Sequence, residues 1–165
     1  MTDYHFTRNP MFQDISTPSQ LLPTLWLSGC HYAQQHSALE ALGVTAIVNL
    51  TPDDYGHAAA GFKTLHIDID DAAVIDPALV GQFLSQMDTW SATDETILIH
   101  CHAGISRTSA FAIAWLMHRE GVTADTDLRK LWAACEDQVA LARPIIMPHY
   151  LLKQAVLTYF LSTLS

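Results

Sequence analysis

Residues 97–108 read Ile-Leu-Ile-His-Cys-His-Ala-Gly-Ile-Ser-Arg-Thr, and this stretch decides the interpretation of the whole chain. Its first part is an apolar run that is typical of a buried strand. The strand leads to Cys101, and a short loop then ends at Arg107. The segment 109–119 that follows is rich in Ala, Ile, Leu, Trp and Met and predicts a buried helix. The sequence therefore predicts a cysteine and an arginine at the two ends of one loop.

The loop between Cys101 and Arg107 has the composition of an oxyanion-binding loop. It contains small or flexible residues, which let successive backbone N–H groups turn toward one anion. The positive end of the following helix would point at the same anion, and the arginine guanidinium would add a bidentate fork. The residues expected to bind a phosphate group are His102, Ala103, Gly104, Ile105, Ser106 and Arg107.

Cys101 is the candidate nucleophile of this loop. Converging N–H donors, a helix N-terminus and an adjacent cation favour the thiolate form of a cysteine, which is the reactive form. We therefore expect Cys101 to act as a covalent catalyst. Cys30 and Cys135 are interpreted as small buried hydrophobic residues. Whether either of them protects Cys101 by a reversible disulfide is left open.

The pattern His-Cys-x-x-Gly-x-x-Arg-Thr at 100–108 resembles the signature of the cysteine-dependent protein tyrosine phosphatases, and the fuller string resembles their dual-specificity branch. Residues 22–29 are similar to the opening strand of dual-specificity domains, and residues 47–52 to their next buried strand. Residues 143–148 are similar to the segment before their last helix, so the resemblance spans about 21–160. It implies a small catalytic-domain protein of the dual-specificity phosphatase type.

The predicted elements fit the same architecture. Their alternation favours an α/β fold: a central, mostly parallel sheet flanked by helices, with the phosphate loop between the central strand and a buried helix. We expect one domain over 21–165 after an N-terminal lead segment, 1–20. The expected strands lie near 21–28, 44–50, 64–69 and 96–100, and the expected helices near 32–42, 78–90, 109–119, 125–136 and 149–161.

A phosphatase of this kind also needs a proton donor for the leaving oxygen. Apolar and polar residues alternate at 65–69, which predicts a half-buried strand that runs into a loop. Asp71 follows this strand about thirty residues before Cys101, which is where the resemblance suggests the general acid. Asp70 remains the alternative, because the end of the strand can shift by one residue.

Four further residues have expected roles around the loop. The resemblance suggests that the Thr108 hydroxyl lies close to the sulfur and eases its departure, although a hydroxyl there can also cap the helix. We expect His100 to support the loop through hydrogen bonds rather than to transfer protons. Arg143 is expected either to contact a second anionic group on the substrate or to lie on the surface before a proline turn. His149 stands where the family commonly has Asn, so the usual N-terminal capping of the last helix is in doubt.

Composition argues against several classes of partner. Eight Lys and Arg stand against 17 Asp and Glu, a net charge of −9, which disfavours nucleic acid. The N-terminus lacks the apolar core of a signal peptide, and no stretch approaches the roughly 20 apolar residues of a membrane span. Three cysteines do not suggest a disulfide framework. We expect a cytoplasmic protein with no membrane partner, and leave its oligomeric state open.

No metal and no cofactor are expected. The nine histidines are scattered without the short pairings that zinc sites usually show. Loop amides and Arg107 would supply the charge stabilisation that magnesium supplies in other phosphoryl-transfer enzymes.

The substrate is expected to be a phosphorylated protein. The variable loop positions carry no lysine, whereas phosphoinositide and polyphosphate branches that share the signature often have one. This favours hydrolysis of phosphotyrosine and of phosphoserine or phosphothreonine. The alternatives are a phosphatase for phosphoinositides, inositol phosphates or RNA 5′ phosphates, a phosphate-binding module without turnover, and a rhodanese-type sulfur transferase.

Overall fold

The structure is a computed structural model that describes residues 15–164. Its sheet has five strands in the order β1-β2-β5-β3-β4, and β5 therefore lies in the centre. The first pair is antiparallel and the other three pairs are parallel. The strands are β1 (Ser19–Leu22), β2 (Leu25–Ser28), β3 (Ala46–Asn49), β4 (Lys63–His66) and β5 (Ile97–His100). The predicted central, mostly parallel sheet is confirmed.

The single strand predicted at 21–28 is wrong, because a hairpin divides it. Leu22 pairs with Leu25 across a turn at Pro23 and Thr24. Proline has no N–H to donate to a ladder, so it stands at a strand end rather than inside a strand. Of the predicted lead segment 1–20, residues 1–14 lie outside the described residues, and β1 already begins at Ser19.

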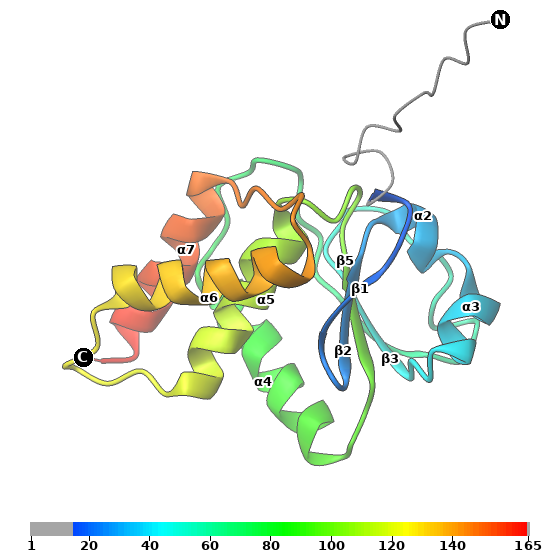
Figure 1. The fold of residues 1–165 in the computed structure, drawn as a ribbon, viewed down its shortest axis with the longest axis horizontal. Helices are drawn as coiled ribbons and strands as arrows, with labels where there is room; N and C mark the ends of the chain where they lie inside the picture. The colour runs from blue at the N-terminus through cyan, green and yellow to red at the C-terminus, as the bar shows by residue number, and fades with distance from the viewer. Residues whose placement is uncertain (1–14, 165) are drawn as a thin grey trace, which may run out of the picture.

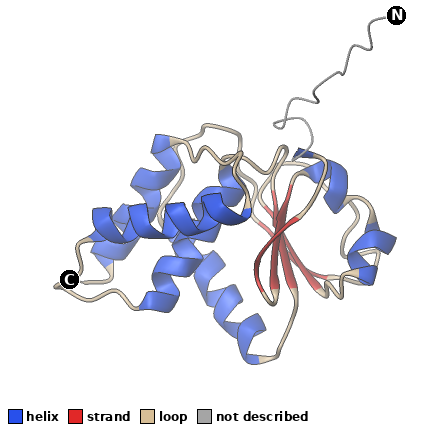
Figure 2. Cartoon of the chain, in the orientation of Figure 1, coloured by secondary structure: helices blue, strands red, loops and turns tan. Residues whose placement is uncertain are grey.

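Helices cover both faces of the sheet (Figures 1 and 2). The four longer helices, α4 to α7, pack on one face, and the short α2 and α3 lie on the other. No helix within 15–164 is long and apolar enough to cross a membrane. The helices are α2 (Cys30–Ala33), α3 (His36–Ala41), α4 (Ala78–Ala92), α5 (Arg107–Glu120), α6 (Leu128–Ala142) and α7 (Tyr150–Ser162).

The single helix predicted at 32–42 is also wrong, because it breaks at Gln35, whose φ of −85° and ψ of 72° are not helical. Ala33 and Leu39 are both fully buried. Six residues apart on one straight helix, they would point roughly 120° away from each other. The break lets both side chains face the core.

Helix α5 is the central helix of the larger layer. Every residue from Arg107 to Met117 is buried, as expected for a helix surrounded by other elements. It packs against α4, α6 and α7 and against the sheet, with Phe111 and Phe83 meeting edge to face at 5.1 Å. The first turn of α5 is thereby held rigidly beside the end of β5.

Candidate active site

Cys101 directly follows β5, at the carboxyl end of the central strand. Its side chain is buried, with 2% of the residue exposed. Ser106 is the N-cap residue of α5, and Arg107 begins that helix. The strand, loop and helix thus follow one another as the sequence predicts, in the crevice where open α/β sheets bind ligands.

The loop presses directly against the end of β2, with glycine on both sides. Gly104 has φ +72°, and a Cβ there would lie 2.6 Å from the carbonyl group of Ser28. A Cβ on Gly29 would lie 2.7 Å from the carbonyl oxygen of His102. Neither position can hold a side chain unless the backbones move apart.

The carbonyl groups of residues 101–106 all accept hydrogen bonds from outside the loop, at distances from 2.7 to 3.2 Å. The donors are the His100 ring to Cys101, the Cys30 amide to His102, the Arg143 guanidinium to Ala103 and Gly104, the Met147 amide to Ile105, and the Ala110 amide to Ser106.

The outward carbonyls determine the direction of the loop amides. In a planar trans peptide the C=O of one residue and the N–H of the next point in opposite directions. Six carbonyls directed outward therefore turn the N–H groups of residues 102–107 to the inner side of the loop. Successive inward N–H groups form a concave site for an anion.

Arg107 lies at the end of this ring of amides and is 4% exposed. Its Nη1 donates to the carbonyl oxygens of Ile69 at 2.7 Å and Leu50 at 3.3 Å. Within 15–164, Nε of Arg107 is the one buried side-chain nitrogen or oxygen without a hydrogen-bond partner. A buried N–H of a guanidinium is costly to leave unpaired, so it points to an anionic ligand at this place.

Asp71 is the carboxylate that meets Arg107. Its Oδ1 lies 3.8 Å from Arg107 Nε, while 71% of the Asp71 side chain is exposed. The Ala73 amide donates to the Asp70 carbonyl, and this turn holds Asp71 beside the site. Ala72 adopts φ +55° in the same turn. The sequence left open whether Asp71 or Asp70 is the general acid. Of these two carboxylates, Asp71 is the one that forms an ion pair with Arg107 among the described residues.

For Thr108 and for His149, the structure contradicts one expectation about helix capping. Thr108 does not cap α5, because Ser106 is the N-cap, and the buried Thr108 hydroxyl lies 3.5 Å from the Ser28 carbonyl oxygen, to which it donates. The ring of His149 accepts a hydrogen bond from the Leu151 amide at 3.2 Å. His149 therefore caps α7, and the doubt raised by the missing asparagine is resolved.

Both interpretations of Arg143 are wrong. The side chain is fully buried and bonds to the protein itself, donating to the carbonyls of Gly104 at 2.8 Å and Ala103 at 3.2 Å. Its Nη1 also donates to the Thr17 carbonyl at 2.9 Å and the Ser19 hydroxyl at 3.1 Å. Arg143 thus connects the phosphate loop to the start of β1. No sequence signal distinguishes this arginine from a surface arginine before a proline.

His100 is completely buried behind Cys101, and a second histidine that the sequence did not single out lies against it. Nε2 of His57 is 2.8 Å from Nε2 of His100. Burial lowers the pKa of His57 to about 4 and that of His100 to about 3. Both imidazoles are therefore neutral at physiological pH.

The three cysteines are free. Cys30 Sγ lies 3.5 Å from Nδ1 of His102, so this thiol contacts the loop. Cys135 lies on α6, where burial, reinforced by Glu120, raises the pKa of its thiol to about 11. In the part of the chain that the structure describes, no three His, Cys, Asp or Glu side chains are arranged so that they could hold a metal ion.

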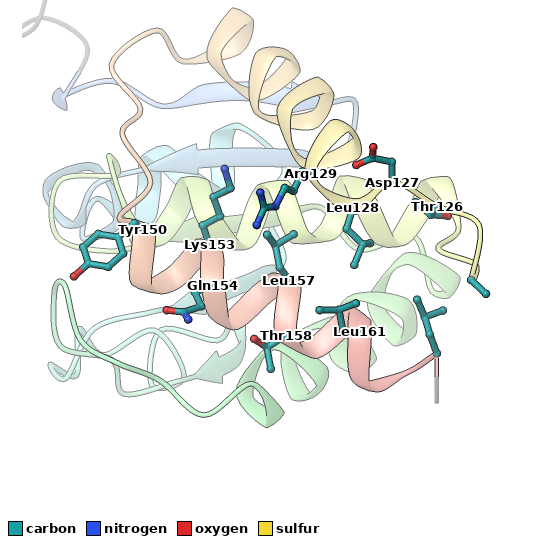
Figure 3. A pocket seen from close by; sticks show the side chains of 12 residues that line it. Thr126, Asp127, Leu128, Arg129, Tyr150, Lys153, Gln154, Leu157, Thr158 and Leu161 are labelled. Atoms are coloured by element: carbon teal, nitrogen blue, oxygen red, sulfur yellow. The ribbon is translucent and has the colours of Figure 1, made fainter.

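A separate cavity of about 730 Å³ lies between α6 and α7 (Figure 3). Leucines of both helices line it, together with Arg129 and Lys153. None of its lining residues belongs to the phosphate loop or to the turn at Asp71.

Comparison with known proteins identifies the family. The family model described as "Dual specificity phosphatase, catalytic domain" matches residues 25–160. Dual specificity protein phosphatase 4 of Gallus gallus is 30% identical over 140 residues, which cover 83% of this chain and 35% of the relative. Dual specificity protein phosphatase 2 of Homo sapiens is 27% identical over 145 residues, which cover 87% of this chain and 43% of the relative.

A solved structure supports the fold independently. Human DUSP28 matches with a TM-score of 0.75 at 23% identity, over 88% of this chain and 96% of that chain. The chain spans less than half the length of the curated relatives above, and the shared part contains the strand, loop and helix of the site. The chain therefore belongs to the dual specificity phosphatase catalytic-domain family.

Proposed function

We propose that this protein hydrolyses phosphate monoesters on tyrosine and on serine or threonine side chains, through a phosphocysteine at Cys101. The observation that carries the proposal is the inward ring of amides at 102–107, with Cys101 at one end. At the other end lies Nε of Arg107, which is buried without a hydrogen-bond partner. Such a ring stabilises the charge of a phosphoryl group without a metal.

In the first step the Cys101 thiolate attacks phosphorus, and the phosphorus–oxygen bond to the substrate side chain breaks. The loop amides and Arg107 hold the three remaining oxygens. The leaving oxygen takes the electron pair and a proton from Asp71, which leaves a neutral alcohol or phenol and a phosphocysteine. The short separation of Asp71 and Arg107 supports this assignment, because it brings the acid to the edge of the phosphate site.

In the second step water attacks the phosphocysteine. Asp71 now accepts the proton of this water, and the sulfur–phosphorus bond breaks to regenerate the Cys101 thiolate and release inorganic phosphate. Thr108 lies in the first turn of α5 and, by the family resemblance, would donate to the departing sulfur. His100 would hold the loop without exchanging protons, in agreement with its low pKa.

The charges around the loop favour a phosphoprotein over a polyphosphorylated substrate. Residues 102–106 carry no lysine or arginine, and the Asp71 carboxylate borders the site. Arg143 is already bound to loop carbonyls and so does not reach a second anionic group. A substrate with several phosphates would lack cationic partners here.

The test is phosphate release from a phosphotyrosine peptide, a phosphothreonine peptide and a phosphoinositide, measured with a chelator present. We expect release from both peptides, and loss of release with retained binding of tungstate in Cys101→Ser. Cys135→Ala, which removes a thiol on α6 instead, serves as the matched control. Release from the phosphoinositide alone would show that the protein is a phosphatase for a non-protein substrate. Tungstate binding with no release from any substrate would indicate a phosphate-binding module without turnover.

A further inference from the structure

A chain of three histidines connects the surface to the main chain of Cys101. Nε2 of His36 lies 2.9 Å from Nδ1 of His57, and Nε2 of His57 lies 2.8 Å from Nε2 of His100. Nδ1 of His100 lies 3.0 Å from the Cys101 carbonyl oxygen. The three rings come from α3, from the segment between β3 and β4 and from the end of β5, so the fold alone brings them together.

The carbonyl at the inner end determines where each proton sits. A carbonyl oxygen only accepts, so His100 carries its proton on Nδ1 and presents Nε2 as an acceptor. His57 must then donate from Nε2, which leaves its Nδ1 to accept from Nε2 of His36. Three neutral imidazoles supply one N–H each for three hydrogen bonds. The chain is complete without any additional proton.

Burial makes the inner bond difficult to replace. His57 is 2% exposed and His100 is fully buried, whereas His36 is half-buried at the outer end. The ring of Tyr55 packs against both inner rings, at 5.9 Å from His57 and 5.3 Å from His100. Water therefore has no free access to Nε2 of His100. The lowered pKa values of both buried rings agree with a neutral chain.

We propose that His57 is a positioning residue for the phosphate loop and that His36 supports it from the surface. By donating to His100, His57 holds that ring in the orientation that keeps the Cys101 carbonyl outward. The same peptide unit carries the His102 amide, the first N–H of the anion site. The inference rests on the proposed function only in that the loop binds a tetrahedral oxyanion, and it does not require turnover.

Two amide substitutions at one position separate positioning from packing. The nitrogen of Gln in His57→Gln can take the place of Nε2 and still donate to His100. The shorter His57→Asn can reach only the place of Nδ1, so it keeps the outer contact with His36 and loses the inner one. Both are polar and neutral, and they differ by one methylene. His31→Gln, on an exposed histidine of α2, is the control.

The measurement is the dissociation constant of tungstate by calorimetry, with kcat and KM on a phosphotyrosine peptide determined in parallel. Loss of one hydrogen bond to a buried group corresponds to about tenfold in affinity. We expect His57→Asn to weaken tungstate about tenfold and to lower kcat/KM at least as much. His57→Gln should stay within about threefold of the wild type, and His36→Asn should fall between the two.

Equal defects in His57→Gln and His57→Asn would overturn the proposal, as would wild-type tungstate affinity in His57→Asn. If the Asn variant does not fold, ring ¹⁵N spectra of the wild type decide instead. The proposal requires the Nε2–H tautomer at His57 and the Nδ1–H tautomer at His100, and the opposite tautomer at His57 refutes it. Tungstate binding without turnover in the wild type would contradict the proposed function and leave this test intact.

Discussion

Acidification from pH 7 to pH 5 should destabilise the protein by about 2 kcal/mol for each of the two buried histidines, His57 and His100. Burial lowers their pKa values to about 4 and about 3 in the native state, whereas in the unfolded chain the ordinary value is about 6.5. Between these limits the unfolded chain binds a proton on each ring and the native protein does not. Stability is therefore complete above about pH 6.5 and falls as the pH drops toward 4.

The magnitude follows from the proton binding of the unfolded chain. At pH 5 an imidazole with a pKa of about 6.5 is stabilised by roughly 2 kcal/mol through protonation, and at pH 7 by only a few tenths. The native ring gains almost nothing over this range. The neighbours of His57 include His36 and His66, which disfavour its protonation, and Asp54, which favours it but less strongly than burial opposes it.

Urea unfolding followed by circular dichroism at pH 7 and pH 5, at one ionic strength, measures the effect. Carboxylates and the other histidines also titrate, so the informative quantity is the difference between the wild type and His57→Gln. The wild type should lose about 2 kcal/mol more than this variant between the two pH values. His31→Gln should behave like the wild type, because that ring is exposed. Equal losses in the wild type and His57→Gln would refute the reasoning.

Three other substitutions have defined expected outcomes. Asp71→Asn should lower kcat about 10²- to 10⁴-fold on phosphopeptides and much less on an aryl phosphate with a good leaving group. Steady-state kinetics measure this difference. If Asp70→Asn shows the pattern instead, Asp70 is the general acid. Arg143→Met should lower the free energy of unfolding by about 3 kcal/mol or more in urea titrations, because two loop carbonyls lose charged donors. Gly104→Ala should abolish tungstate binding in calorimetry, since its Cβ would lie 2.6 Å from the Ser28 carbonyl, and wild-type affinity would contradict the close packing.

The strand, loop and helix around Cys101 were predictable because their signals are local. An apolar run ends at Cys101, and a second apolar segment begins after Arg107, so composition alone places both residues at one loop. The family resemblance added Asp71, and the structure brings it next to Arg107. Its role as the acid stays a prediction.

The supports of the loop were not predictable, because their partners lie far away in the sequence. Arg143 reaches carbonyls about forty residues earlier in the chain, and His57 meets His100 across 43 residues. Nothing near either residue indicates burial, because arginine and histidine are usually exposed or half-exposed. The helix break at Gln35 was not predicted for a related reason. The direction in which Leu39 points depends on the sheet against which it packs.

The close packing of Gly104 against Ser28, and of Gly29 against His102, makes the anion site depend on the sheet. One wall of the loop is the end of β2, and the parallel pairing of β2 with β5 holds this wall in place. Without this pairing, the loop would lose the wall that packs against Gly104. Oxyanions therefore select the fully assembled protein, and a ligand at one hundred times its dissociation constant would add about 2.7 kcal/mol to its stability. Ligand binding at the loop is thus coupled to the pairing of β2 with β5, and bound oxyanion lowers the population of any form in which this pairing is open.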